Sequence, residues 1–256
     1  MITFAYPTAA YAPQLAELKK LGIPVVNEYS SGDPVGSNGI LDPTPYRNEY
    51  WNTQGEALGK YVLANATEPV KAVMFKVSLY GNNTLMGEGF KTEIEKQCAD
   101  CEVDFEELPV TAIGTDKLPP LVTSYFQSNP DTNWGYPAWT DLITGVPAAM
   151  RGAGVGGKAK LVTLQAGGPA PAANSYLENE EEVFAMAHVP GADSTWQCID
   201  ELIRHFTGMS TEEDGPSTAS TWLVTKKVME EELGQYEGNY PMVADYETQF
   251  EELWGG

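Results

Sequence analysis

Two hydrophobic periods alternate along the chain. Short apolar runs are typical of β-strands, and longer stretches with apolar residues three or four positions apart are typical of amphipathic helices. The strand pattern covers residues 2–6, 24–29, 70–78, 103–110, 133–139 and 158–167. The helix pattern covers residues 9–22, 48–66, 83–97, 116–128, 140–154 and 194–206, the fifth of these being interrupted. Strands and helices therefore take turns through most of the sequence.

Alternation of this kind predicts an α/β fold, in which a parallel sheet is buried between layers of helices. Ligands of such sheets bind at the carboxyl ends of the strands. The strand at 24–29 opens into a polar turn with a glycine, which places Asn27 to Ser30 at the rim of a binding crevice. An ordinary surface loop is the alternative interpretation of this stretch.

The composition indicates a globular protein of 256 residues, with 42% hydrophobic and 20% charged residues. No apolar run approaches the ~20 residues of a membrane-spanning helix. The net charge of −21 opposes binding to nucleic-acid phosphates or to an anionic membrane surface. A small ligand is therefore expected to be neutral or cationic.

The glycine-rich stretch at residues 151–159 comes close to two phosphate-binding motifs. Such motifs need a strand before the glycines and a helix after them, so that backbone amides at the helix start face the phosphates. Here a helix precedes and a strand follows, and Ala159 stands where a Ser or Thr would hold magnesium. These glycines are expected to end one helix and turn the chain into the next strand.

Other catalytic or metal-binding patterns are weak. The two histidines, His188 and His205, lack the spacing of a zinc site, and no nucleophile elbow of the type GxSxG occurs. Cys198 lies inside a helical pattern, which favours a small buried side chain over a Cys/His pair with His205. The acidic runs at 177–183 and 210–215 lack a calcium-loop register and are interpreted as solvated loops.

Cys98 and Cys101 form a CxxC pair between a predicted helix and a predicted strand. Redox-active pairs usually stand at the start of a helix, where the thiolate is stabilised, rather than after its end. A structural disulfide and two reduced cysteines are the remaining interpretations. The first seven residues lack the basic segment and the longer apolar segment of a signal peptide.

The order of several segments resembles the type I periplasmic binding proteins, the sugar-type solute-binding components of ABC importers, in a ribose-binding-like branch. ITFAYPT followed by QLAELKKLGIPVVNEYSSGD is similar to a strand, helix and GIPVV strand of that family. KAVMFKVS with MGEGFKTEIEKQCADCEV resembles the start of its second lobe, where some members carry a CxxC. YFQSNPDTNWGYPAWTDLITGV resembles a ligand-touching segment, and STWQCIDELIRHFTG and DYETQFEELWGG resemble a late first-lobe helix and the C-terminal tail.

The resemblance implies two lobes, each a parallel sheet flanked by helices, joined by a hinge. Family members begin with βα units before the strand seen here as ITFAY, so the first lobe is expected to be incomplete. That lobe would hold residues 1–43 and 189–218, the second lobe residues 44–188, and residues 219–256 a hinge-crossing strand and C-terminal tail. The resemblance and the CxxC spacing together predict a disulfide between Cys98 and Cys101.

Carried over position by position, the family pattern gives a set of candidate ligand-binding residues. Ribose binders have an Asp-Arg pair that holds sugar hydroxyls where this chain has Tyr29 and Ser30, so both charges are missing. Gln165 stands where relatives often have Asp, and His188 where a Gln is common at the return through the hinge. The remaining candidates lie in two loops after predicted strands: Asn82, Asn83, Thr84, Trp139, Thr140 and Asp141.

The implied function is binding of a small neutral ligand, a sugar or sugar-like compound, and its presentation to an ABC transporter permease. No enzymatic activity, cofactor, metal or nucleic acid is expected. The resemblance implies a periplasmic or extracellular location, and some proteins of this kind are attached to the membrane by a lipid anchor. Two alternatives stay open. One is a ligand-sensing domain like those of lac-repressor-like regulators, and against it this sequence shows no basic helix-turn-helix segment. The other is an α/β enzyme with an unrecognised active site.

Overall fold

The computed structural model describes residues 1–3, 7–29, 40–41, 48–166, 171–179, 182–189, 191–209, 221–233, 243 and 245–255. The strands are β1 (Ile2–Thr3), β2 (Val25–Asn27), β3 (Ile40–Leu41), β4 (Lys71–Lys76), β5 (Glu102–Glu107), β6 (Trp134–Pro137), β7 (Lys160–Ala166), β8 (Val183–Val189) and β9 (Trp222–Val224). The α-helices are α1 (Ala12–Lys20), α2 (Asn48–Asn65), α3 (Gly81–Gln97), α4 (Leu118–Ser128), α5 (Val146–Gly152), α6 (Pro171–Glu178), α7 (Ala192–Thr207), α8 (Lys226–Val228) and α9 (Tyr246–Leu253). Shorter helical turns are η1 (Thr8–Tyr11), η4 (Val110–Ala112), η5 (Thr140–Ile143) and η6 (Met229–Leu233).

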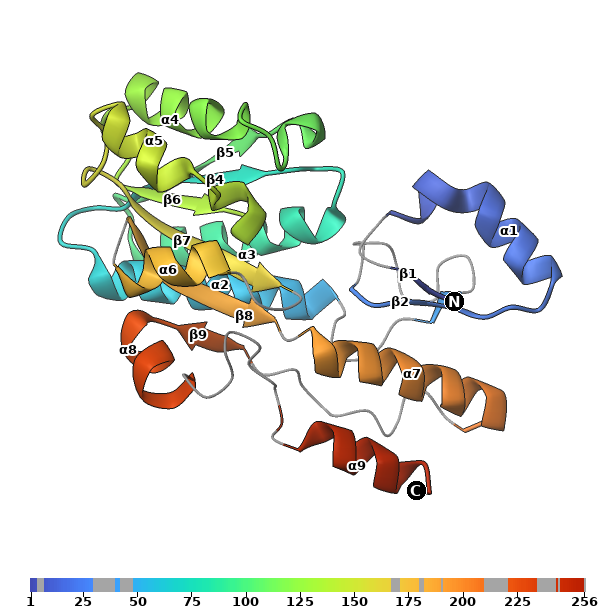
Figure 1. Cartoon of the computed structure of the whole chain (residues 1–256). Coiled ribbons are helices and arrows are strands. Elements are labelled where there is room, and N and C mark those ends of the chain that lie inside the picture. Colours follow the sequence, from blue (N-terminus) through green and yellow to red (C-terminus); the bar gives the residue numbers. More distant parts are fainter. Residues whose placement is uncertain are drawn as a thin grey trace.

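The larger of two sheets has the strand order β5-β4-β6-β7-β8-β9. The first five of these strands are parallel, and β9 runs antiparallel to β8. Residues along β4 alternate between the two helix layers: Met74 lies against Gly87 of α3, and Phe75 packs on Phe126 of α4. Figure 1 shows the two layers, with α4 and α5 on one side of the sheet and α2 and α3 on the other. The central strands β4, β6, β7 and β8 are therefore buried on both faces, as their nearly continuous apolar residues predict, whereas the edge strand β5 is mostly exposed.

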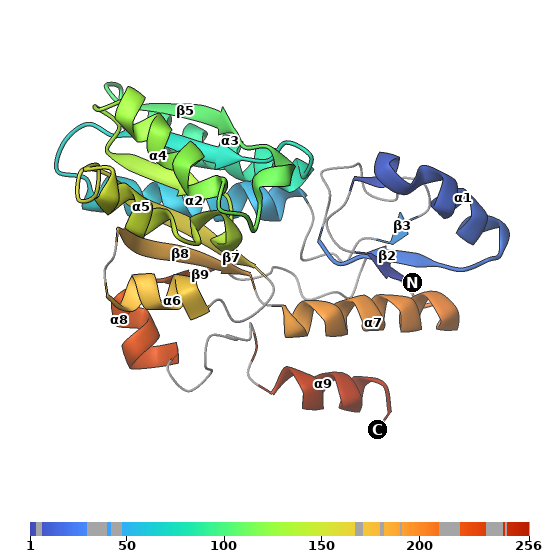
Figure 2. The ribbon, with the colours of Figure 1, turned by 45° about the horizontal axis from the view of Figure 1, so that its top comes forward.

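The smaller sheet consists of β1, β2 and β3, all parallel. Leu15 of α1, Val25 and Ile40 form its separate core on one face. In Figures 1 and 2, α1 and α7 lie on opposite sides of this sheet. The sequence predicted this α/β class with parallel sheets flanked by helices, and the structure confirms it.

The C-terminal half of the chain passes between the two sheets more than once. After β8 it leaves the larger sheet to form α7, and it returns to that sheet as β9. The last helix, α9, then packs on α7, where Trp196 stacks on Trp254 with 5.3 Å between ring centroids. The indole N–H of Trp254 also donates to Asp200 Oδ1 at 3.0 Å. Segments far apart in sequence are thus interleaved around both sheets.

Two helices of the larger unit, α2 and α3, are in backbone contact. A Cβ atom at Gly55 would lie 1.9 Å from the carbonyl oxygen of Met86, and one at Gly89 would lie 2.1 Å from that of Asn52. Only glycine permits this approach, because any larger residue would overlap the facing backbone. The short distance lets α2 and α3 cover the same face of the sheet side by side.

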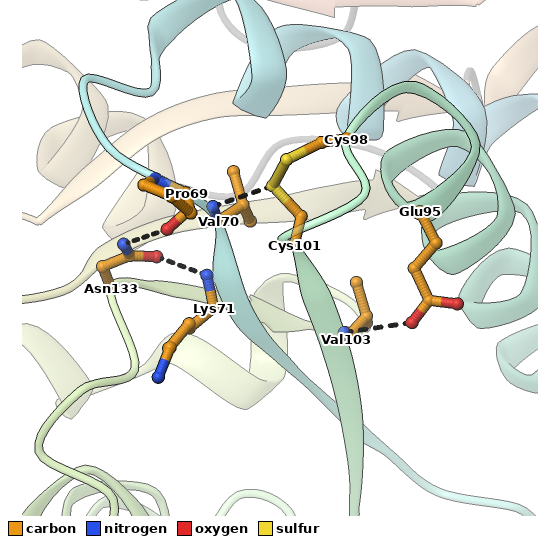
Figure 3. Close-up of a disulfide and its surroundings, with 8 residues drawn as sticks. All are labelled: Pro69, Val70, Lys71, Glu95, Cys98, Cys101, Val103 and Asn133. Carbon is orange, nitrogen blue, oxygen red and sulfur yellow. Dashed lines mark hydrogen bonds between the residues drawn. A yellow bond between two sulfur atoms is a disulfide. The ribbon is translucent and has the colours of Figure 1, made fainter.

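A disulfide joins Cys98 and Cys101, as predicted, with the Cα atoms 5.3 Å apart. Figure 3 shows it at the amino ends of β4 and β5, where the backbone N–H of Val70 donates to Cys101 Sγ at 3.0 Å. Beside it, the side chain of Asn133 accepts from the Lys71 N–H at 2.9 Å and donates to the Pro69 carbonyl at 3.0 Å. These contacts fix the starts of three adjacent strands relative to one another.

Some sequence interpretations need correction. The acidic run at 177–183 is not simply a solvated loop: Leu177 is fully buried in α6, and Val183 begins the buried strand β8. Glu182 is 9% exposed and pairs at 2.8 Å with Arg151, whose side chain is partly exposed, so one carboxylate of the run is buried and held by an ion pair. The other acidic run, at 210–215, lies outside the described residues.

Other interpretations are confirmed. The glycines after α5 end that helix and turn the chain into β7, with Gly154 and Gly157 at positive φ. The interruption in the helix at 140–154 is real and falls at Gly145, whose φ of 76° separates η5 from α5. Cys198 is fully buried, as the helical pattern around it predicted.

Thiol titration tests the disulfide. In denatured, unreduced protein we expect one reactive thiol, from Cys198, and three after reduction. Because the loop is short, the disulfide removes little entropy from the unfolded chain, so reduction should cost on the order of 2 kcal/mol or less. Three reactive thiols before reduction, in protein isolated under oxidising conditions, would contradict the pairing.

The glycine contact between α2 and α3 can be tested by adding a methyl group. Gly55→Ala or Gly89→Ala should each lower the free energy of unfolding by about 1–3 kcal/mol, the usual cost of overpacking. Gly152→Ala is the matched control, because a Cβ atom there meets nothing within 4 Å, and its effect should stay within about 0.5 kcal/mol. Urea denaturation of the three variants measures the difference, and equal stabilities would refute the proposed backbone contact.

Candidate functional site

The carboxyl ends of the parallel strands β4, β6, β7 and β8 meet at one edge of the larger sheet. In Figure 1 this edge faces the smaller sheet. The candidate site is built from the segments that follow these strands and from the end of β2. Because a parallel sheet brings strand ends together regardless of sequence separation, residues from positions 80 to 188 reach the same region.

The first turn of α3, which follows β4, supplies three of the predicted residues: Asn82, Asn83 and Thr84. Asn83 accepts from the backbone N–H of Val77 at 3.2 Å and donates to Asn82 Oδ1 at 3.2 Å. Both amide side chains are buried, and Thr84 is half-buried beside them. The amide oxygen and nitrogen of Asn83 therefore brace the turn that begins α3.

After β6 the chain presents an aromatic pair. Trp139 is half-buried and meets Tyr80, from the turn after β4, edge to face at 5.6 Å between ring centroids. The indole N–H of Trp139 donates to Asp141 Oδ2 at 3.1 Å, which fixes the orientation of the ring. Asp141 itself is exposed, and Thr140 between them is buried. The structure thus brings Trp139 and Asp141 together and adds Tyr80 to them.

Gln165 and His188 lie side by side on neighbouring strands. They are register partners in the β7–β8 ladder, and His188 is also paired with Trp222 of β9. Both side chains are fully buried. Two buried polar residues far apart in sequence thus lie next to each other on adjacent strands.

The end of β2 contributes Tyr29, which is 1% exposed. Its ring packs edge to face on Trp51 of α2, with centroids 5.6 Å apart, and Trp51 in turn contacts Tyr50 at 5.3 Å. Tyr29 follows a strand of the smaller sheet, yet it belongs to the apolar core of the larger unit. This contact links the two sheets. Ser30, the other residue predicted here, lies outside the described residues.

Glu28 fixes the path of the chain between the sheets. Its Oε1 accepts from Ser194 Oγ at 2.6 Å and from Thr195 Oγ1 at 2.9 Å, both in the first turn of α7. The chain reaches these residues shortly after the end of β8, where it leaves the larger sheet. The end of β2 and the crossing from β8 to α7 are therefore held together.

Two residues of this region were missed by sequence reasoning, Tyr80 and Trp51, whereas Glu28 lies in the stretch from Asn27 to Ser30 that was expected at the rim. Tyr80 follows a predicted strand, so the rule that strand ends face a ligand could have found it. Trp51 lies in the first turn of α2, and its position depends on how the two sheets pack.

Tyr136, near the end of β6, is fully buried, and burial raises the pKa of its hydroxyl because the phenolate would be desolvated.

The described residues show neither a metal site nor a membrane span. No group of three or more His, Cys, Asp or Glu among them could hold a metal ion. No helix in the described ranges is both long enough and apolar enough to cross a bilayer.

A cavity of about 230 Å³, lined by Phe126, Val155 and Ala159 among others, lies at the amino ends of β6 and β7, opposite the candidate site.

The sequence matches no protein-family model and no curated protein. Solved structures match it in fold. A glucose–galactose-binding protein from Geobacillus stearothermophilus, GanP, is 15% identical, with a TM-score of 0.67 over 88% of this chain and 76% of its own. An ABC transporter solute-binding protein from Agrobacterium vitis with bound allitol is 17% identical, with a TM-score of 0.69 over 91% and 78%. One from Actinobacillus succinogenes with bound D-allose is 16% identical, with a TM-score of 0.66 over 90% and 79%.

These matches confirm the resemblance at the level of the fold. The chain has the type I periplasmic-binding fold of sugar ABC transporter solute-binding proteins, and it is shorter than the chains it matches.

The contact between the two sheets can be tested at Tyr29. Tyr29→Ala should cost about 3–5 kcal/mol, the range for removing a buried ring, and should uncouple the unfolding of the two units. Tyr29→Phe keeps the ring and is the matched control. Unfolding followed by tryptophan fluorescence and by far-ultraviolet circular dichroism should give separate transitions for Tyr29→Ala alone. Coincident transitions at an unchanged midpoint in that variant would argue against the role of the contact.

Proposed function

We propose that this chain is a non-enzymatic solute-binding protein that holds a small neutral ligand, a sugar or sugar-like compound, between its two sheets. The observation that carries the proposal is the aromatic and polar set after β4 and β6, Tyr80, Trp139 and Asp141, on the edge that faces the smaller sheet. An aromatic face with hydrogen-bonding groups beside it suits a ligand with an apolar face and hydroxyl groups. Neighbours of this fold hold allitol and D-allose, which supports the same ligand class here.

The proposed roles follow from position. Trp139 stacks on the ligand, and Asp141 and Gln165 orient it by hydrogen bonds. His188, beside Gln165, contacts the ligand or stabilises the hinge, where the chain leaves the larger sheet. Asn82, Asn83 and Thr84 shape the turn that borders the site, and Tyr29 borders it from the smaller sheet. Ser30, the next residue in the sequence, is a further candidate for ligand contact.

The ligand is expected to be less polar than ribose. Tyr29 is buried against Trp51, so the end of β2 offers an aromatic ring where ribose binders have a charged residue. Binding would then depend on stacking and apolar burial more than on ionic hydrogen bonds. Sugar derivatives with fewer hydroxyls and small aromatic compounds both fit this requirement.

Function in this proposal is closure of two lobes. Residues 1–43 and 189–218 form one lobe, residues 44–188 the other, and residues 219–256 cross the hinge and return. The ligand makes contacts in the closed state that the open state lacks, and this difference shifts the population toward closure. The closed form is then recognised by an ABC transporter permease, which places the protein outside the cytoplasm in the periplasm or at the cell surface.

The most direct test is to identify what the protein carries. Protein purified without added ligand is denatured, and the released small molecules are analysed by mass spectrometry. A released sugar, polyol or related neutral compound that rebinds the refolded protein in calorimetry is the expected result. Catalytic conversion of that compound, or binding only of phosphorylated or anionic molecules, would reject the proposal.

The role of Trp139 is tested by calorimetry with allitol, D-allose, D-glucose and D-galactose, and with any ligand released by the protein. Trp139→Ala should weaken binding by about 1–3 kcal/mol, because a large apolar contact is lost. Tyr125→Phe is the control, since Tyr125 lies on α4 and hydrogen-bonds Asp104 of β5, away from this edge. Equal affinities of Trp139→Ala and wild type, with both proteins folded, would return Trp139 to a purely structural role.

A further inference from the structure

The sequence contains two motifs of the form Asn-x-Ser/Thr, the pattern that accepts N-linked sugars in proteins outside the cytoplasm. One is NAT at residues 65–67, and the other is NNT at residues 82–84. In sequence the two are equivalent, because each has an acceptor asparagine, a threonine two residues later and no proline between them. An N-linked oligosaccharide is bulky and hydrophilic, so a folded chain can carry it only at its surface. The structure therefore separates the two motifs by their burial.

The motif at 82–84 is closed off in the first turn of α3. Asn82 is 7% exposed, and its Oδ1 accepts from Asn83 Nδ2 at 3.2 Å. Asn83 is 3% exposed, and its own Oδ1 accepts from the Val77 N–H at 3.2 Å. A sugar on Asn82 would have to displace the groups that cover this side chain. The folded chain therefore excludes this motif as an acceptor.

The motif at 65–67 is open to solvent. Asn65 is the last residue of α2, and both Asn65 and Thr67 are exposed. The amide nitrogen of Asn65 donates to the Tyr61 carbonyl at 2.8 Å, and this contact lies at the surface. Water can replace an exposed hydrogen bond at little net cost, which frees the amide for reaction. The acceptor nitrogen and the threonine hydroxyl are thus both within reach of an enzyme.

The chain directly after this motif is anchored. Asn133 Nδ2 donates to Glu68 Oε1 at 3.3 Å and to the Pro69 carbonyl at 3.0 Å. The Val70 N–H donates to Cys101 Sγ in the disulfide, as Figure 3 shows. The exposed motif is therefore held between the end of α2 and the start of the larger sheet.

This position is remote from the candidate site. The motif lies between the end of α2 and the start of β4, which is the amino edge of the larger sheet. In Figure 1, α2 runs from the side of the smaller sheet to the opposite end of the larger one. A sugar at residue 65 would therefore leave the edge around Trp139 free.

We propose that Asn65 is an N-glycosylation site and that Asn82 is not. The sugar donor is an oligosaccharide joined through its anomeric carbon to a lipid phosphate, and an oligosaccharyltransferase catalyses the transfer. Asn65 Nδ2 attacks the anomeric carbon, and the new C–N bond forms as the bond from that carbon to the phosphate oxygen breaks. The lipid phosphate leaves with the electron pair of that bond, and one amide proton passes to a base. Thr67 identifies Asn65 as the acceptor.

The inference rests on the location outside the cytoplasm that belongs to the proposed function, and it does not depend on the ligand. Because the sugar would lie on the far edge of the sheet, ligand affinity should be the same in glycosylated protein and in protein without the sugar.

The test is peptide mass spectrometry of the chain isolated from the cells that naturally produce it. Trypsin cleaves after lysine, so the two motifs fall in separate peptides, residues 61–71 and residues 77–91. The first peptide should be heavier than its sequence by the mass of an oligosaccharide, which fragmentation removes as sugar units. The second peptide should have the mass of its sequence, and it serves as the internal control.

Three variants produced in the same cells separate the motif from the fold. Asn65→Gln removes the acceptor and Thr67→Ala removes the hydroxyl, so each should abolish the added mass. Thr67→Ser keeps the hydroxyl and is the matched control, which should retain the added mass. Both positions are exposed, and thermal melts check that all three variants are folded.

The possible contrary results are distinct. An unmodified 61–71 peptide in protein recovered from outside the cytoplasm would overturn the inference and leave the proposed ligand binding intact. Sugar on the 77–91 peptide would contradict the selection by burial, and added mass that persists in Thr67→Ala would show attachment independent of the motif. Unmodified protein found only in the cytoplasm would overturn both the inference and the location on which it rests.

Discussion

Parallel pairing of β4, β6, β7 and β8 is the constraint on which the candidate site depends. It forces all four strands to end at one edge, and it buries both faces of the sheet, so polar groups can reach solvent or a ligand only where the strands stop. The aromatic pair of Tyr80 and Trp139 exists because the turns after β4 and β6 are neighbours there. The same pairing sets Gln165 beside His188 across a ladder.

The two units are joined by contacts made in the segments between them. Tyr29 leaves the smaller sheet to pack on Trp51, and Glu28 holds the first turn of α7 where the chain returns. A protein that closes around a ligand needs such connections to be few, because each one must persist or reform as the lobes move. The contacts of Tyr29 and Glu28 lie near the carboxyl ends of the strands of the larger sheet. The connection between the two units and the candidate site are therefore in the same region. The closure proposed above would therefore change the site directly.

The two units differ in how much they bury. Within the described residues, the six-stranded sheet has a large core, whereas the three-stranded sheet has a core of three buried residues. Stability of the smaller unit therefore depends on what packs against it, from α7 and α9 outward.

The sequence alone determined the class of fold, because the alternation of apolar periods is a local property that survives without knowledge of neighbours. It also placed the end of α5 at its glycines, and the CxxC spacing together with the family resemblance predicted the disulfide between Cys98 and Cys101. The tertiary structure decided the rest. The run at 177–183 looks solvated because it carries several carboxylates, yet one of them, Glu182, is buried and pairs with the distant Arg151. Trp51 gave no signal as a site residue, since its partner Tyr29 comes from another sheet. Contacts between segments far apart in sequence depend on packing across the sheets, and a local pattern of residues does not encode them.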